Sequence, residues 1–220
     1  MSGLFITIEG TDGAGKSTQI ELLKIYLEKN NFDFTFVREP GGTQISEQIR
    51  NIILDSNNSS MNRVTEALLY SSSRAQLVSE VIQPALKKGR IVICDRYIDS
   101  SIAYQGFGRN LGIDLITKIN NVATNGLLPD ITFFLDLPPN DAFNRKKLLK
   151  NVNGEVKELD RIEKESDYFY NQVYLGYKTL AKKYSERIKT IDALNPIEKI
   201  HEEIIGHIED LFSIVIYNNN

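Results

Sequence analysis

A glycine-rich turn lies between an apolar run and a helical pattern near the start of the chain. Residues 10–17 read Gly-Thr-Asp-Gly-Ala-Gly-Lys-Ser and match the phosphate-binding pattern G-x-x-x-x-G-K-[ST]. They follow the apolar run Leu4–Ile8 and precede a helix predicted from about Lys16 to Glu28. Glycines in this context let backbone N–H groups converge at the positive end of a helix dipole. The pattern predicts an anion-binding loop, and an ordinary glycine-rich turn is the alternative.

The side chains of this loop suit a nucleoside triphosphate. Lys16 is expected to reach the β- and γ-phosphates, and the hydroxyl of Ser17 is expected to ligate Mg²⁺. The predicted ATP-binding residues are Gly10, Thr11, Asp12, Gly13, Ala14, Gly15, Lys16, Ser17 and Thr18.

Apolar runs of strand length alternate with segments of helical period along the rest of the chain. The predicted strands are Leu4–Glu9, Phe34–Arg38, Arg90–Cys94, Ile131–Asp136 and Ile188–Asp192. This alternation predicts an α/β fold in which a five-stranded parallel sheet has helices on both faces. A length of 220 residues with no internal repeat or linker suits one domain over 1–220.

The composition and net charge of the chain limit the kinds of partner that it can bind. The 26 basic and 29 acidic residues leave a net charge of −3, which offers no bulk attraction for nucleic acid or an anionic membrane. The single cysteine, Cys94, lies in an apolar run and suits core packing in a reducing cytoplasm. Neither a signal peptide nor an apolar stretch of membrane-spanning length is present in the sequence. We therefore expect a cytoplasmic protein without nucleic-acid or membrane partners.

Charged residues follow two of the predicted strands. Asp95 comes directly after an apolar run, and ligands of open α/β sheets bind at the carboxyl ends of strands, so Asp95 is expected to hold the Mg²⁺ hydration shell. Capping of a turn or helix is the alternative for a lone aspartate. Arg96 follows it, and Arg38 ends the preceding predicted strand. These guanidinium groups are expected to face a second phosphate-bearing ligand.

Five segments together resemble the bacterial type of the thymidylate kinase family, in the family's order. They are Gly10–Thr18, Arg38–Thr43, Tyr70 with Arg74, Asp95–Gly106 and Leu159–Glu163. The segments R-E-P-G-G-T and D-R-Y are more diagnostic than the phosphate loop, which many families share. The resemblance implies a three-layer phosphate-loop kinase fold with a mobile lid, and transfer of a phosphoryl group from ATP to dTMP, giving dTDP and ADP, in dTTP synthesis for DNA replication. It also implies Mg²⁺ as cofactor and a homodimer.

The resemblance implies a dTMP site. Tyr70 would lie along the thymine ring, with an ordinary core aromatic as the alternative. Arg74 on the same helix face would reach a base carbonyl, and Asp12 would accept a hydrogen bond from the 3′-hydroxyl, unless it only forms the turn. Tyr104 would crowd the sugar where a ribonucleotide carries its 2′-hydroxyl. The implied dTMP-binding residues are Asp12, Arg38, Tyr70, Arg74, Arg96, Ser101, Tyr104 and Gln105.

The catalytic residues implied are Lys16, Arg161, Arg145, Asp95 and Glu39. The phosphate loop itself has no arginine, and in the bacterial type the catalytic arginine lies in the lid, which corresponds here to about 145–163. Arg161 is the first choice and Arg145 the second, because a polar insertion around 151–154 leaves the register open. Lysines 146, 147 and 150 are interpreted as a solvated helix face. Glu39 is expected near the phosphates and Mg²⁺, with a cis peptide bond to Pro40.

Two other classes of protein could use a phosphate loop: a switch or assembly ATPase that acts as a binding module, and another nucleoside monophosphate kinase. A switch GTPase should carry an Asn-Lys-x-Asp motif, which the sequence lacks, and a partitioning ATPase usually carries a second lysine where Thr11 and Asp12 stand. Another nucleoside monophosphate kinase is the nearer alternative, and the segment Arg38–Thr43 disfavours it.

Overall fold

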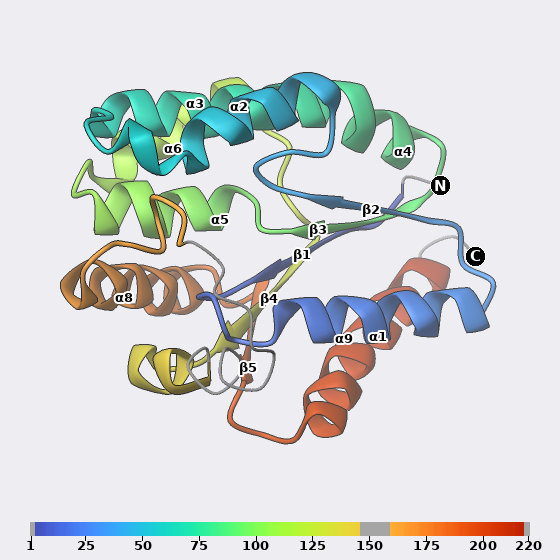
Figure 1. Ribbon diagram of the computed structural model, residues 1–220. Coiled ribbons are helices and arrows are strands. Elements are labelled where there is room, and N and C mark those ends of the chain that lie inside the picture. Colours follow the sequence, from blue (N-terminus) through green and yellow to red (C-terminus); the bar gives the residue numbers. More distant parts are fainter. Residues whose placement is uncertain (1–2, 146–158, 218–220) are drawn as a thin grey trace.

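The protein contains one parallel sheet of five strands in the order β2-β3-β1-β4-β5. The computed structural model describes residues 3–145 and 159–217 (Figure 1). The strands are β1 (Phe5–Glu9), β2 (Phe34–Arg38), β3 (Ile91–Asp95), β4 (Ile131–Asp136) and β5 (Ile188–Asp192). They confirm the predicted strands, with ends that differ by at most one residue.

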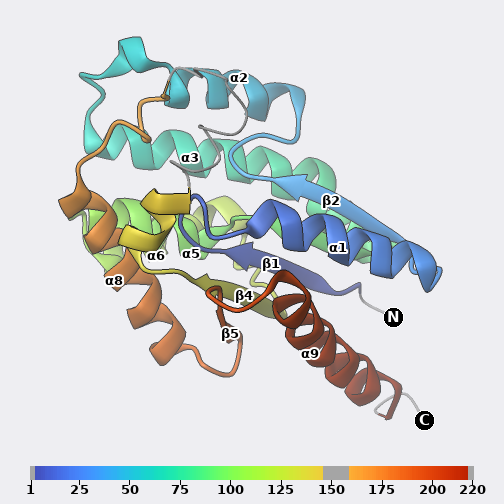
Figure 2. The ribbon, with the colours of Figure 1, turned by 60° about the horizontal axis from the view of Figure 1, so that its bottom comes forward.

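Helices cover both faces of the sheet, as predicted. Helices α1 (Lys16–Lys29) and α9 (Ile197–Tyr217) lie together on one face (Figure 2). The other face carries α3 (Arg63–Leu77), η2 (Val78–Ile82), α4 (Gln83–Lys87), α5 (Ile98–Ser101), η3 (Ile102–Gly108), α6 (Ile113–Thr124) and α8 (Asp167–Lys183). Helix α2 (Gln44–Leu54) packs on α3, and the short η1 (Ser56–Asn58) follows it.

The alternation of side chains along the strands explains the three layers. In β1, Ile6 and Ile8 are buried against α1 and α9, whereas Phe5 is buried on the opposite face with Cys94 of β3. Successive residues of a strand point to opposite faces, so a sheet covered on both sides needs continuous apolar runs. Burial also raises the pKa of the Cys94 thiol, which confirms its predicted place in the core.

The way α1 and α2 begin determines which backbone N–H groups stay open near the site. Helix α1 begins after Gly15, whose φ of 95° is left-handed and which offers no side-chain cap, so the first N–H groups of the helix stay open to an anion. Helix α2 is capped by Thr43, whose Oγ1 accepts a hydrogen bond from Ser46 N at 3.1 Å. None of the described helices is long and apolar enough to cross a bilayer.

Candidate active site

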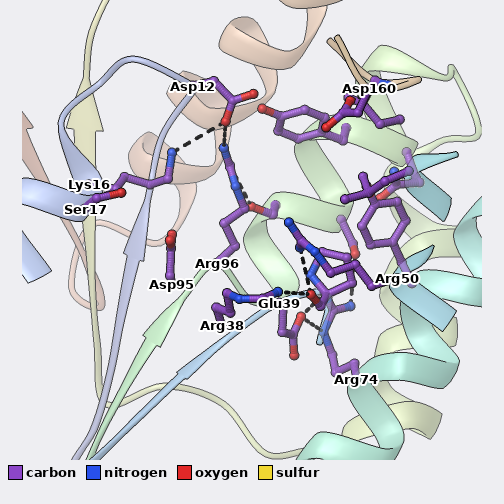
Figure 3. A pocket seen from close by; sticks show the side chains of 18 of the residues that line it. Asp12, Lys16, Ser17, Arg38, Glu39, Arg50, Arg74, Asp95, Arg96 and Asp160 are labelled. Carbon is purple, nitrogen blue, oxygen red and sulfur yellow. Dashed lines mark hydrogen bonds and ion pairs between the residues drawn. The ribbon is translucent and has the colours of Figure 1, made fainter. Parts of the chain in front are cut away.

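A cavity of about 450 Å³ opens at the carboxyl ends of the sheet (Figure 3). Parallel pairing sets the end of β3 beside the ends of β1 and β2, with Asp95 opposite both Ile8 and Arg38. The loops after these strands therefore meet, as the sequence predicted. The cavity is lined by Asp12, Gly13, Gly15, Lys16, Ser17, Thr18, Arg38, Glu39, Pro40, Arg50, Leu54, Tyr70, Arg74, Asp95, Arg96, Ser100, Ser101, Tyr104, Gln105, Asp160 and Ile162.

The phosphate loop is wound around the ammonium group of Lys16. Its Nζ donates hydrogen bonds to the carbonyls of Gly10 and Thr11, each at 3.1 Å, and lies 3.9 Å from Asp12 Oδ1. Burial, and next the charge of Arg96, lowers the pKa of Lys16 to about 8. Gly10 has φ 140°, and a Cβ there would lie 2.8 Å from the carbonyl oxygen of Leu135, so the loop needs glycine at this turn.

Two carboxylates at strand ends each have an oxygen without a hydrogen-bond partner in the described part of the chain. Oδ1 of Asp95 and Oε1 of Glu39 are buried and receive no hydrogen bond from the described residues. A buried acceptor without a partner is costly, which suits a site completed by a ligand. Among the described residues no group of three or more His, Cys, Asp or Glu could hold a metal by itself. Mg²⁺ is usually held by one or two protein oxygens together with phosphates and water, so Asp95 and Ser17 fit this metal.

Guanidinium groups line the cavity beside the phosphate loop. Arg96 has φ 67°, and it donates to Asp12 Oδ1 at 2.6 Å and to the Gly10 carbonyl at 2.8 Å. Arg38 donates to the Pro40 carbonyl at 3.0 Å and pairs with Glu47. Figure 3 shows these groups beside Asp95 and Glu39. The arrangement places several cations around a space that already has an anion-binding loop, and planar guanidiniums bind phosphate oxygens bidentately.

Arg50 is a third arginine in this wall, and sequence reasoning missed it. It donates to the Pro40 carbonyl at 2.8 Å. The signal was available in α2, where Arg50 lies on the helix face of the buried residues Ser46 and Ile53. A charged residue on the inward face of an amphipathic helix is unusual and needs a partner there.

The family comparison agrees with this geometry. A family model described as "Thymidylate kinase" matches residues 8–204. The chain belongs to the thymidylate kinase family. It is 48% identical over 207 residues to the thymidylate kinase of Exiguobacterium sp., covering 94% of each chain. It is 46% identical to that of Clostridium novyi, covering 94% of this chain and 98% of the relative. The crystal structure of thymidylate kinase from Ehrlichia chaffeensis superposes with a TM-score of 0.75 at 32% identity, over 95% of this chain and 99% of that one.

The predicted thymidylate-binding residues share the cavity. All eight line it: Asp12, Arg38, Tyr70, Arg74, Arg96, Ser101, Tyr104 and Gln105. Within the described residues the buried Oη of Tyr104 has no hydrogen-bond partner, and Arg96 lies over its ring at 5.3 Å. The peptide bond between Glu39 and Pro40 is cis, as expected. The structure thus brings these residues together, while their individual roles remain predictions.

Arg74 is held differently from the expectation. The prediction placed its guanidinium against a base carbonyl, but its side chain is fully buried and donates four hydrogen bonds within the protein. Its Nε donates to Glu39 Oε2 at 2.8 Å, its Nη1 to Ser101 Oγ at 2.9 Å and to Asn120 Oδ1 at 2.6 Å, and its Nη2 to the Tyr97 carbonyl at 3.1 Å. Nη2 also forms an ion pair with Glu39 Oε2 at 2.6 Å. Contact with a base would require Arg74 to exchange one of these partners. In this structure it fixes Glu39 and Ser101 in the wall of the cavity.

The two lid arginines do not line the cavity. Arg161 is buried, its Nε donates to the Ile53 carbonyl at 2.8 Å, and its Nη1 donates to Glu66 Oε2 at 2.6 Å. It therefore binds a free carbonyl at the carboxyl end of α2, a common role for arginine. Arg145 donates to the Ala193 carbonyl at 2.7 Å, after β5. A catalytic role for Arg145 would need it to leave this partner, whereas Nη2 of Arg161 is buried without a hydrogen-bond partner among the described residues. Residues 146–158 of the predicted lid, which hold the three lysines 146, 147 and 150 and also Lys157, lie outside the described residues.

Proposed function

We propose that the phosphate loop holds ATP, and that the arginine-lined part of the same cavity holds dTMP. As a member of its family the chain is a dTMP kinase: it transfers a phosphoryl group from ATP to dTMP, giving dTDP and ADP, in dTTP synthesis. The observation that carries the site assignment is a single cavity in which Lys16 faces Arg38 and Arg96. Two phosphate-bearing ligands that must react belong in one such space.

The acceptor phosphate would be bound by exchange of partners. Arg38 and Arg50 now donate to the Pro40 carbonyl, and Arg96 donates to Gly10 and Asp12. Phosphate oxygens of dTMP are stronger, charged acceptors for these donors. Tyr70 would lie along the thymine ring, Asp12 would accept from the 3′-hydroxyl, and Tyr104 would lie against the sugar.

The reaction needs positioning and positive charge more than a general base. A dTMP phosphate oxygen is already anionic when it attacks the γ-phosphorus, so a new P–O bond forms as the bond to the β-γ bridging oxygen breaks, without removal of a proton. Lys16 and the arginines would stabilise the charge on the transferred group. Ser17 and, through water, Asp95 would hold Mg²⁺, whose charge supports the same phosphates when it is bound.

The chain is also proposed to act as a homodimer. Large apolar side chains are exposed on α3 and on its two packing partners α2 and α6: Ile45, Ile52, Val64, Leu68, Leu115 and Val122. A second copy would cover this surface. The net charge of −3 suits neither nucleic acid nor an anionic membrane as partner, and a buried, unpaired thiol suits the cytoplasm.

A substrate panel tests the proposed function. ADP release is measured with ATP and Mg²⁺ against dTMP, dUMP, dCMP and AMP. We expect dTMP to be the best substrate, and dUMP, which lacks one methyl group, to lose roughly 10- to 200-fold in kcat/KM. Lys16→Ala should abolish turnover, whereas Lys24→Ala, at a residue of the same helix that pairs with Glu21 outside the cavity, should keep it. Turnover of AMP as fast as that of dTMP would contradict the proposal.

A further inference from the structure

One face of α3 carries both a buried carboxylate and two residues that line the cavity. Glu66, Tyr70 and Arg74 follow one another at intervals of four residues, so they lie on the same side of the helix. Tyr70 and Arg74 line the cavity, whereas Glu66 lies behind it with 1% of its side chain exposed. This glutamate has no part in the function described so far.

Glu66 receives hydrogen bonds from three side chains. Its Oε1 accepts from Gln105 Nε2 at 3.0 Å and from Arg109 Nε at 3.0 Å. Its Oε2 accepts from Arg109 Nη2 at 2.9 Å and from Arg161 Nη1 at 2.6 Å. Only Gln105 among these partners also lines the cavity. The carboxylate therefore contacts the cavity indirectly, through one amide.

The charge of Glu66 determines whether the nitrogen or the oxygen of the Gln105 amide points toward the carboxylate. Burial alone would raise the pKa of Glu66, but hydrogen bonds and charge from Arg109, with further bonds from Gln105 and Arg161, lower it overall, so the group is ionised at neutral pH. An ionised carboxylate can only accept hydrogen bonds. Gln105 must turn its nitrogen toward Glu66, which leaves its carbonyl oxygen as the atom it can offer to a ligand in the cavity.

A fixed carbonyl distinguishes the two common pyrimidines. Thymine carries an N–H donor at N3, whereas cytosine has an unprotonated N3 that accepts. A carbonyl oxygen bonds the first and repels the second. Sites built to bind a donor discriminate strongly against a ligand that lacks it.

We propose that Glu66 is a positioning residue that selects thymine over cytosine by holding the Gln105 carbonyl toward the base. The proposal rests on the proposed function, because it requires dTMP to lie in this cavity. Its consequence is that specificity depends on a side chain that never touches the substrate.

Glu66→Gln tests the proposal because the arginines can only donate. The new amide would keep its oxygen at the position of Oε2, where Nε and Nη2 of Arg109 and Nη1 of Arg161 all donate, so its nitrogen would meet Gln105 and favour the flipped amide there. The ratio of kcat/KM for dTMP to that for dCMP should fall at least about tenfold, mainly through KM, as expected for one lost hydrogen bond. Glu165→Gln is the matched control, since Glu165 also pairs with Arg109 but does not contact Gln105. Its ratio should stay within about threefold of wild type.

A double variant separates positioning from general damage. In a Gln105→Met background, Glu66→Gln should no longer change the ratio, because no amide remains to be turned. If Glu66→Gln does not yield folded protein by thermal denaturation, Glu66→Asp keeps the charge while withdrawing it from Gln105, and the same fall is expected. An unchanged ratio in either folded variant, or an equal further fall in the Gln105→Met background, overturns the inference. A wild-type enzyme inactive on dTMP would instead overturn the proposed function.

Discussion

At the scale of single residues, the cations of the site are held by the protein's own oxygens. Lys16 binds two loop carbonyls, Arg96 binds Asp12 and the Gly10 carbonyl, and Arg38 binds Glu47. These contacts keep the cations in position, so phosphates can replace acceptors without large movements of the donors. Burial lowers the pKa of Lys16 to about 8, so the protonation of its amine changes near neutral pH.

The pKa of Lys16 predicts an alkaline loss of activity. Below about pH 8 its amine is protonated and can bind the phosphates, and above that value it becomes neutral. The ratio kcat/KM for ATP reports the free enzyme, so it should fall as pH rises through about 8. Bound phosphates favour the charged amine, so kcat at saturating ATP should fall only at higher pH.

Loss of stability would not explain this profile. From about pH 8 to the ordinary value of 10.5, Lys16 binds fewer protons in the folded than in the unfolded chain, so this group makes the fold more stable as pH rises. Steady-state rates from about pH 6.5 to 9.5, with thermal melting at each pH, check the prediction. A value of kcat/KM that stays flat across this range would rule it out.

At the scale of elements, the close contact between α8 and η3 positions one wall of the cavity. Tyr104 and Gln105 belong to η3, which directly continues α5. Figure 1 shows α8 beside this continuous helix. A Cβ on Gly176 of α8 would lie 3.0 Å from Ala103 Cα and 3.0 Å from the ring of Phe107. Because Gly176 has no side chain, the backbones of α8 and η3 can come into direct contact.

Gly176→Ala should therefore disturb both stability and substrate binding. Overpacking of this kind costs about 1–3 kcal/mol, part of which is offset by the better helix propensity of alanine. We expect a lower Tm and a higher KM for dTMP, with a smaller effect on the KM for ATP. Gly206→Ala in α9 is the control, because nothing lies within 4 Å of its added methyl group. That variant should gain about 0.5–1 kcal/mol, and equal melting temperatures for the two variants would contradict the packing argument.

At the scale of the whole molecule, one sheet is covered by helices on both faces, and several large apolar side chains stay exposed on α2, α3 and α6. Two of these helices also line the cavity, because α2 contributes Arg50 and α3 contributes Tyr70 and Arg74. A dimer through this surface would stabilise α3, which carries Tyr70 and Arg74. Assembly and substrate binding would then share the same helices.

Light scattering after size exclusion tests this assembly. The expected mass is about twice the chain mass of 25.0 kDa. Leu68→Glu places a charge on the proposed interface and should give a monomer. Leu175→Glu, at a similarly exposed residue of α8, should leave the dimer intact. A monomeric wild-type protein, or a Leu68→Glu variant that stays dimeric, would show that this surface is not the interface.

The sequence by itself determined the strands, the phosphate loop and the charged residues at strand ends. These features depend on local periodicity or on a fixed motif, and in a parallel sheet the ends of adjacent strands must meet. Asp95, Arg96 and Arg38 therefore lie in one cavity, as predicted.

Only the tertiary structure decided how each charged side chain is used. Arg161 binds Glu66, which is 95 residues away, and Arg74 binds Asn120, which is 46 residues away, so neither motif position could reveal its partner. A buried guanidinium must satisfy several donors at once, and the nearest acceptors are set by how helices pack. The same packing made Glu66, a residue of no motif, the hydrogen-bond partner of Gln105, whose side chain lines the cavity.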